Sequence, residues 1–175
     1  MSQISNQRIF LIGFMGCGKS KLGKSVAYKF NRPFIDLDEL IELQNQMPIP
    51  QLFAAVGEQG FREKERDVLQ NAAFAKDVII ATGGGAPCFF DNMEWMNDNG
   101  ITVFIDSPIK VLADRLINAR VERPLVKGKS YEELIEYIEA KLIERRPFYE
   151  QARIKLKELD LNADILMLAL EELND

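Results

Sequence analysis

The segment from Gly13 to Ser20, GFMGCGKS, has the residue types and spacing of a phosphate-binding loop, GxxxxGK[ST]. Its glycines lack a Cβ atom, so that backbone N–H groups can close around phosphate oxygens. Lys19 would reach the β- and γ-phosphates, and the Ser20 hydroxyl is of a type that binds Mg²⁺. The segment therefore predicts the binding of a nucleoside triphosphate together with magnesium.

The residues on either side favour this interpretation over a chance match in a structural turn. The apolar run Ile9–Ile12 precedes the loop and is typical of a buried strand, and residues 22–30 are expected to form a helix. The N-terminal end of a helix carries partial positive charge and attracts phosphate. Strand, glycine-rich turn and helix are the context that the pattern requires.

Two carboxylates follow the next predicted strand, residues 34–36. Asp36 and Asp38 point the same way if that strand continues through both. In open α/β sheets, ligands bind at the carboxyl edge of the strands, where such a pair would lie. The alternative is that Asp38 caps a helix and Asp36 is solvated. Beside a phosphate loop, we expect a functional role.

Two further segments could contact a ligand. Arg62 and Glu65 are three residues apart, so they share a helix face and Glu65 could aim the Arg62 guanidinium, unless both lie on a solvated charged face. The predicted strand 78–81 ends in Thr82-Gly83-Gly84-Gly85, and this bare backbone would let a ligand hydroxyl approach N–H groups. The alternative for the glycines is a flexible turn.

Residues 119–129, ARVERPLVKGK, are rich in cations and lack apolar periodicity. This pattern is typical of a mobile lid that brings Arg to the phosphates, although an ordinary basic loop is the alternative. The lid is followed by a predicted long helix, residues 131–151, with a capping box formed by Ser130 and Glu133. Pro147 is expected to kink or end that helix.

Composition limits the class of protein. The 175 residues are 47% apolar, which suits a single domain over residues 1–175. The net charge of −5 argues against nucleic acid or an anionic membrane as a partner. There is no His, which excludes a His/Cys metal site and makes a carboxylate the candidate general base. We expect a cytoplasmic protein, because the two cysteines are isolated and the sequence has neither a signal-peptide core nor an apolar run long enough to span a membrane. We expect a monomer, because no long apolar stripe is left unassigned.

Helical and extended patterns alternate along the whole chain, which predicts an α/β fold with a parallel sheet. The remaining strands are expected at residues 101–105 and 153–159. The remaining helices are expected at 39–45, from 61 onward, and at 91–99, 109–118 and 163–173, with a helical turn at 51–56 and a turn at 57–60.

Six motifs in order, GFMGCGKS, DLD, FREKE, TGGG, RPL and RRPFY, resemble the shikimate kinase family of P-loop kinases, from Arg8 to about Ala152. The resemblance implies a five-stranded parallel sheet in the order 2-3-1-4-5, flanked by helices in a three-layer sandwich with a mobile lid. It also implies transfer of the ATP γ-phosphoryl group to the 3-hydroxyl of shikimate, with Mg²⁺, in aromatic amino-acid biosynthesis.

The resemblance assigns roles to residues. Catalysis would fall to Lys19, Asp38 and Arg123, with Arg123 closing from the lid and Asp38 bonding the acceptor hydroxyl. Ser20 and Asp36 would hold the metal. The residues expected at ATP are Gly13, Gly16, Cys17, Gly18, Lys19, Ser20, Lys21, Arg120 and Arg123. Those expected at shikimate are Asp38, Phe61, Arg62, Gly84, Gly85 and Arg145, and the substrate-binding region is expected at about residues 36–65.

Some alternatives stay open. Arg115 and Arg120 are both candidates to lie on the adenine; we favour Arg120, and expect a purine-facing loop at residues 159–162. Gluconate, also a hydroxylated carboxylate, is a competing acceptor. A nucleotide-binding module without turnover would require a defect at a catalytic position, and none is seen.

Overall fold

The computed structural model describes residues 7–119, 126, 128–157 and 161–173. Five strands form one sheet: β1 (Ile9–Ile12), β2 (Phe34–Asp36), β3 (Ile79–Ala81), β4 (Ile101–Asp106) and β5 (Ile154–Lys157). The strand order is β2-β3-β1-β4-β5 and every pairing is parallel, as predicted. In β1, for example, Phe10 lies between Ile80 of β3 and Thr102 of β4.

The burial of each strand follows its place in the sheet. All residues of β1 and β3 are buried, as their continuous apolar runs require for strands covered on both faces. At the edge, β5 alternates: Ile154 and Leu156 are buried, whereas Lys155 and Lys157 are exposed. This confirms that the last strand is more exposed than the others, and lysines at an exposed edge discourage pairing with another sheet.

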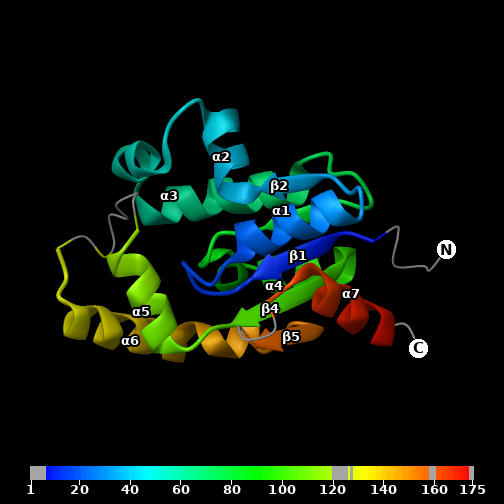
Figure 1. The fold of residues 1–175 in the computed structure, drawn as a ribbon. Coiled ribbons are helices and arrows are strands. Elements are labelled where there is room, and N and C mark those ends of the chain that lie inside the picture. Colours follow the sequence, from blue (N-terminus) through cyan, green and yellow to red (C-terminus); the bar gives the residue numbers. More distant parts are fainter. Residues whose placement is uncertain (1–6, 120–125, 127, 158–160, 174–175) are drawn as a thin grey trace.

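Helices cover both faces of the sheet (Figure 1). Helices α1 and α7 pack against each other on one side, and α3 packs against α4 on the other, while α5 and α6 contact each other beyond the carboxyl end of β4. The helices are α1 (Lys19–Lys29), α2 (Leu37–Asn45), α3 (Ile49–Asn71), α4 (Asn92–Asn99), α5 (Ile109–Ile117), α6 (Tyr131–Tyr149) and α7 (Ala163–Glu172), with a short 3₁₀ helix, η2 (Ala86–Cys88). Among the described helices, none is long and apolar enough to cross a membrane.

The break predicted at residues 57–60 is present but is confined to Gly57, so the prediction was wrong only for residues 58–60. Helix α3 continues through this region and is broken only at Gly57, whose backbone angles are φ 71° and ψ −179°. That conformation is open to glycine and strained for other residues. One glycine therefore redirects the helix, and Gly60 is already helical again.

Helix α6 confirms one terminal prediction and refines another. Ser130 and Glu133 form the predicted capping box at its start. Pro147 lies inside the helix, which ends at Tyr149. Pro147 lacks an N–H group and so removes one hydrogen bond in the last turn. The helix ends two residues later, as expected for a proline that ends a helix.

Candidate active site

The phosphate loop joins β1 to α1 and is shaped by its glycines. Gly13, Gly16 and Gly18 have positive φ angles of 141°, 82° and 98°. At Gly13 a Cβ atom would lie 2.8 Å from the carbonyl oxygen of Ile105, so no side chain fits between the loop and β4. Helix α1 begins at Lys19, earlier than predicted, and no side chain caps it, so its first N–H groups are open to a ligand anion.

Lys19 is held against the loop. Its side chain is largely buried, and Nζ donates hydrogen bonds to the carbonyl oxygens of Gly13 (2.8 Å) and Phe14 (3.0 Å). The sulfur of Cys17 lies 3.6 Å from the same nitrogen. Cys17 itself is fully buried, and its N–H donates to the Phe14 carbonyl, so its contribution is to the shape of the loop.

The Ser20 hydroxyl and the Asp36 carboxylate meet at the carboxyl end of β2. Ser20 Oγ donates a 2.6 Å hydrogen bond to Asp36 Oδ2, while Asp36 Oδ1 accepts the backbone N–H of Asp38. The two carboxylates therefore do not share one strand face: β2 ends at Asp36, which caps α2, and Asp38 lies in the first turn of that helix. The alternative that made Asp38 the cap was also wrong by two residues.

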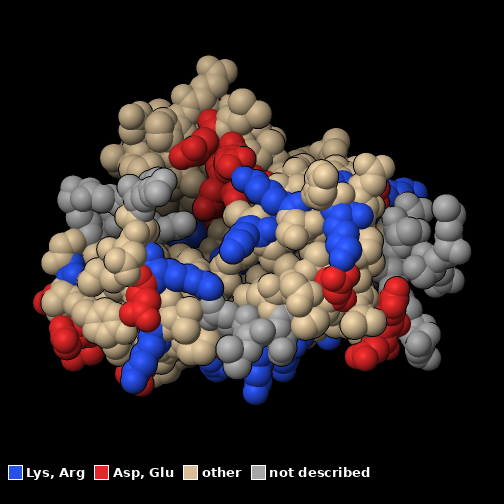
Figure 2. Space-filling model, viewed as in Figure 1, with Lys and Arg blue, Asp and Glu red and all other residues tan. Residues whose placement is uncertain are grey.

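Two cavities meet at Asp38. The first, which we call the phosphate cavity, has a volume of about 330 Å³; the second, the arginine cavity, of about 380 Å³. Figure 2 shows acidic side chains gathered over α2 and next to Lys and Arg side chains, beside a hollow on this face. Met15, Asp38, Gly83 and Gly84 line both cavities. The phosphate cavity is otherwise lined by Gly16, Gly18, Lys19, Ser20, Lys21, Asp36, Thr82 and Arg115. The arginine cavity is otherwise lined by Ile49, Pro50, Phe53, Phe61, Arg62, Glu65, Gly85 and Arg145.

One wall of the arginine cavity is apolar. The rings of Phe53 and Phe61 stack with centroids 4.2 Å apart, and Phe61 is buried. Phe53, Met15, Ile49 and Pro50 were missed in the sequence. Because the helix is broken at Gly57, between Phe53 and Phe61, helical spacing gave no signal that the two rings stack.

Arg62 and Glu65 form a buried ion pair at the base of this cavity. Arg62 Nη1 lies 2.8 Å from Glu65 Oε2, and the side-chain exposures are 10% and 1%. Burial raises the pKa of Glu65 above its ordinary value, and the charge of Arg62 opposes that rise. The pair confirms that Glu65 aims Arg62 and excludes the solvated charged face. Sequence analysis had not placed Glu65 in the site.

The surroundings of Arg62 bury one of its donors without a partner among the described residues. Its guanidinium lies over the Phe89 ring, with Cζ 4.3 Å from the centroid, and its buried Nε–H has no partner in the described residues. Behind it, a Cβ atom on Gly85 would lie 2.6 Å from Nη2. The glycine is therefore required for the close approach of the guanidinium to the backbone.

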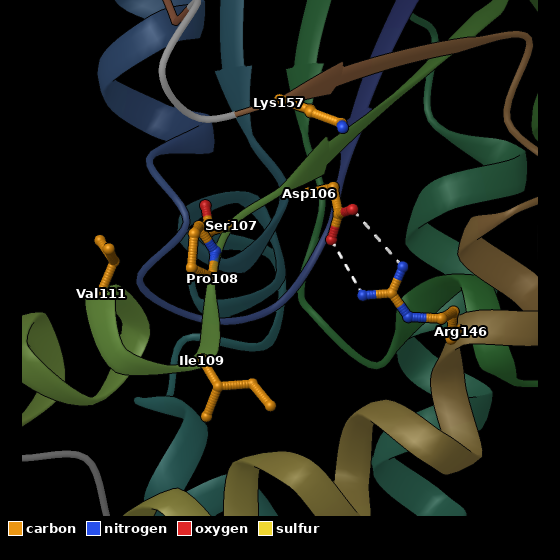
Figure 3. A pocket seen from close by; sticks show the side chains of 7 residues that line it. All are labelled: Asp106, Ser107, Pro108, Ile109, Val111, Arg146 and Lys157. Carbon is orange, nitrogen blue, oxygen red and sulfur yellow. Dashed lines mark hydrogen bonds and ion pairs between the residues drawn. The ribbon is translucent and has the colours of Figure 1, made fainter.

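Of the two consecutive arginines in α6, only Arg145 faces the site. It lines the arginine cavity, and its Cζ lies 5.4 Å from the centroid of Phe14. Arg146 points away and pairs with Asp106 at 3.0 Å and Glu150 at 3.2 Å. It lines a separate cavity of about 640 Å³, shown in Figure 3, which contains none of the expected site residues. Consecutive helical residues project about 100° apart, which accounts for the division.

Arg115 lies at the opposite rim of the phosphate loop. Its Nη1 donates a 3.1 Å hydrogen bond to the Gly16 carbonyl. With Lys21, Leu161 and Asn162 it lines a further cavity of about 470 Å³ beside the phosphate cavity, which we call the third cavity of the site. Leu161 and Asn162 belong to the expected purine-facing loop; the rest of that loop lies outside the described residues. The expected lid residues Arg120 and Arg123 also lie outside them.

The metal-binding capacity of the protein side chains alone is small. Among the described residues there is no cluster of three or more His, Cys, Asp or Glu that could hold a metal ion. Ser20 and Asp36 offer two adjoining hard oxygen ligands at the phosphate cavity. That set fits Mg²⁺, which usually keeps several waters and is shared with substrate phosphates rather than caged by protein.

Comparison with known proteins gives a consistent result. The family model described as shikimate kinase matches residues 15–173. A shikimate kinase of Phocaeicola vulgatus is 52% identical over 146 residues, which are 83% of each chain. The crystal structure of shikimate kinase from Bacteroides thetaiotaomicron superposes with a TM-score of 0.86 at 45% identity, over 95% of this chain and 96% of that one.

A second solved structure is a shikimate kinase from Acinetobacter baumannii in complex with shikimate. It has a TM-score of 0.83 and 32% identity, and the match covers 96% of this chain and 95% of that one. The family model spans residues 15–173, and both solved structures match at least 95% of this chain. This chain belongs to the shikimate kinase family.

Proposed function

We propose that this protein transfers the γ-phosphoryl group of ATP to the 3-hydroxyl of shikimate, giving shikimate 3-phosphate and ADP in the biosynthesis of aromatic amino acids. The observation that carries the proposal is the meeting of the phosphate cavity and the arginine cavity at Asp38. One cavity has the loop and cations that hold a triphosphate, and the other has the paired arginines that hold a carboxylate. Family membership supports the choice of reaction and substrate.

ATP would bind with its phosphates in the loop from Gly13 to Ser20. The N–H groups at the start of α1 and the Lys19 ammonium would neutralise phosphate charge. Ser20 and Asp36 would contribute to the shell of Mg²⁺, with Asp36 bound directly or through water. When bound, Mg²⁺ would withdraw charge from the phosphate oxygens during transfer.

For the adenine, we now favour Arg115 over Arg120. Arg115 lies against the phosphate loop and lines the third cavity together with Lys21 and Asn162. That cavity continues from the phosphate cavity past Gly16 and Gly18, where the purine end of a nucleotide would extend. A guanidinium plane can stack on a purine.

Shikimate would lie in the arginine cavity. Arg62 and Arg145 would bind its carboxylate, since both side chains line this cavity and an arginine fork can bond a carboxylate through two N–H groups. Phe61 would pack against the ring, and the backbone of Gly84 and Gly85 would contact the substrate. Catalysis by phosphoryl transfer depends mainly on such positioning.

Asp38 would act at the junction of the two cavities. There its carboxylate can orient the acceptor hydroxyl toward the γ-phosphate and take its proton late in the transfer. Arg123 would close over the phosphates from the lid, residues 119–129. Closure would exclude water, which otherwise competes as an acceptor.

We also propose that the protein works as a cytoplasmic monomer of one domain. The cytoplasm supplies ATP and keeps thiols reduced, which suits two unpaired cysteines, Cys17 and Cys88. Each residue named in the mechanism belongs to this one chain, so no second copy is needed to complete the site.

The direct test is to identify the product. The purified protein is incubated with ATP, Mg²⁺ and shikimate, and the product is examined by phosphorus and proton NMR. The proposal predicts one phosphomonoester coupled to the proton on C3. A phosphate on another hydroxyl, or hydrolysis of ATP without any phosphorylated shikimate, would contradict it.

A further inference from the structure

Tyr149 is the largest fully buried side chain of the described residues, and its hydroxyl bonds the backbone of Gly84, which lines the site. Its ring packs against Phe104 with centroids 5.1 Å apart. Its hydroxyl donates a 2.5 Å hydrogen bond to the carbonyl oxygen of Gly84. Burial raises the pKa of Tyr149 above its ordinary value, so the phenol keeps the proton that it donates.

The carbonyl that Tyr149 binds belongs to the central peptide of a tight turn. Ala86 N–H donates to the Gly83 carbonyl at 3.1 Å, so Gly84 and Gly85 occupy the two central positions of a four-residue turn. Gly85 has φ −87° and ψ −19°, as in a type I turn. The peptide between two central residues can also take the reversed orientation of a type II turn, which requires positive φ at the second position.

Glycine at both central positions removes the steric barrier to that reversal, because glycine adopts positive and negative φ about equally well. Hydrogen bonds from the turn itself do not fix the orientation of this peptide. Within the described residues, the N–H groups of Gly84 and Gly85 donate to no protein acceptor. The Tyr149 hydroxyl, in contrast, bonds the Gly84 carbonyl in one orientation only.

The orientation decides what the arginine cavity offers a ligand. In a planar trans peptide the C=O and N–H groups point in opposite directions, and the described residues contain no cis peptide bond. With the Gly84 carbonyl turned to Tyr149, the N–H of Gly85 is turned away from it. Gly84 and Gly85 both line the arginine cavity. The reversed peptide would present a carbonyl oxygen where a donor is needed.

Tyr149 also lies one helical turn after Arg145 on α6, and the Arg145 side chain interacts with the same phenol. A Cβ atom on Gly84 would lie 3.4 Å from Arg145 Nη1 and 3.3 Å from the backbone nitrogen of Met15. Gly84 is thus packed between the phosphate loop and Arg145. A change in its peptide would reach the arginine cavity directly.

We infer that Tyr149 is a positioning residue that fixes the Gly84–Gly85 peptide, so that the Gly85 N–H serves as a donor to the acceptor substrate. The inference rests on the proposed function for the identity of that substrate, shikimate. Without the hydroxyl, only the fraction of molecules with the correct peptide orientation binds the acceptor well, and the apparent affinity falls by that fraction.

The test is the substitution Tyr149→Phe, which removes one oxygen and leaves the ring in contact with Phe104. The KM for shikimate should rise about three- to tenfold, the range expected for loss of one hydrogen bond, while the KM for ATP changes less than about twofold. Tyr28→Phe is the matched control, because the Tyr28 side chain on α1 is 93% exposed. It should change neither constant. An unchanged shikimate KM in Tyr149→Phe, or an equal rise in both constants, would overturn the inference.

A second measurement needs no substrate and separates this inference from the proposed function. In the free protein, the amide NMR signals of Gly84 and Gly85 should shift or split in Tyr149→Phe and stay in place in Tyr28→Phe. Unmoved signals would overturn the inference even if shikimate were the substrate. Should the wild-type protein fail to phosphorylate shikimate, the proposed function would fall, and the amide signals would still decide whether Tyr149 fixes the peptide.

Discussion

Ser20 Oγ donates a 2.6 Å hydrogen bond to Asp36 Oδ2, and this contact joins the first turn of α1 to the end of β2. Two oxygen groups from distant parts of the chain are thereby held side by side at the phosphate cavity. In the proposed function, a pair fixed in this way would lose little freedom on binding Mg²⁺ with the nucleotide.

Asp36→Asn should weaken the use of Mg²⁺ more than the binding of shikimate. The amide keeps the shape of the side chain but loses the charge that attracts the cation. Because one charge-assisted contact is worth about 1.5 kcal/mol, about tenfold more Mg²⁺ should be needed for the half-maximal rate. A titration with Mg²⁺ at fixed ATP measures this. An unchanged requirement would remove Asp36 from the metal shell.

Lys19→Met should lower the rate of phosphoryl transfer by about 10²–10³, because the variant keeps the length of the side chain but loses the charge that stabilises the transferring group. Steady-state assay of ADP formation is the measurement. Lys24→Met is the matched control, because Lys24 lies on the same helix but is exposed outside the phosphate cavity. A similar loss in both variants would mean that the effect comes from the stability of α1.

The two arginines of α6 form a natural pair for comparison. Arg145→Ala should raise the shikimate KM by about ten- to a hundredfold, the range for a lost charged hydrogen bond, with little change for ATP. Arg146→Ala should change the shikimate KM less than about threefold, because Arg146 pairs with Asp106 and Glu150 outside the site. Equal effects of the two variants would contradict the assignment of Arg145 to the carboxylate.

The buried pair of Arg62 and Glu65 should make substrate binding depend on pH. Burial raises the pKa of Glu65 above its ordinary value of 4.5. As the pH falls from neutrality, this carboxylate is therefore protonated at a higher pH than an exposed glutamate. Protonation removes the charge that orients Arg62, and the shikimate KM should rise in that range.

Glu65→Gln is the control for this pH dependence, because glutamine fits the same space and does not titrate. Its shikimate KM should be higher than that of the wild type at neutral pH and should vary less as the pH falls. Titration of shikimate itself affects both proteins alike. Superimposable pH profiles would show that Glu65 does not control Arg62.

Much of the fold followed from the sequence because local patterns and long-range packing agree. The phosphate loop and the strand before it are examples, because a buried apolar run such as Ile9–Ile12 is typical of a strand covered on both faces of a parallel sheet. The resemblance to a family supplied the order of the strands. The exception at residues 57–60 arose because Gly60 was interpreted as a turn residue, although only Gly57 leaves helical geometry.

The site was predicted less completely, for reasons of geometry. Polar residues with characteristic spacing, such as Lys19, Asp38 and Arg62, could be identified, whereas the apolar wall that includes Phe53 looks like ordinary core in a sequence. The conformation around Asp36 depended on where β2 ends, and a shift of two residues changes which carboxylate becomes the helix cap. The bond from Tyr149 to Gly84 spans 65 positions and has no local signal.

The central claim is tested most directly by measuring ADP release from Mg-ATP with shikimate, with gluconate and with no acceptor. The account predicts rapid release with shikimate alone, with Asp38→Asn as the control that keeps the fold and loses the rate. Release with gluconate instead would retain phosphoryl transfer at this site but overturn the substrate. No release with either acceptor from a protein that still binds ATP would contradict the assignment of this site as a kinase.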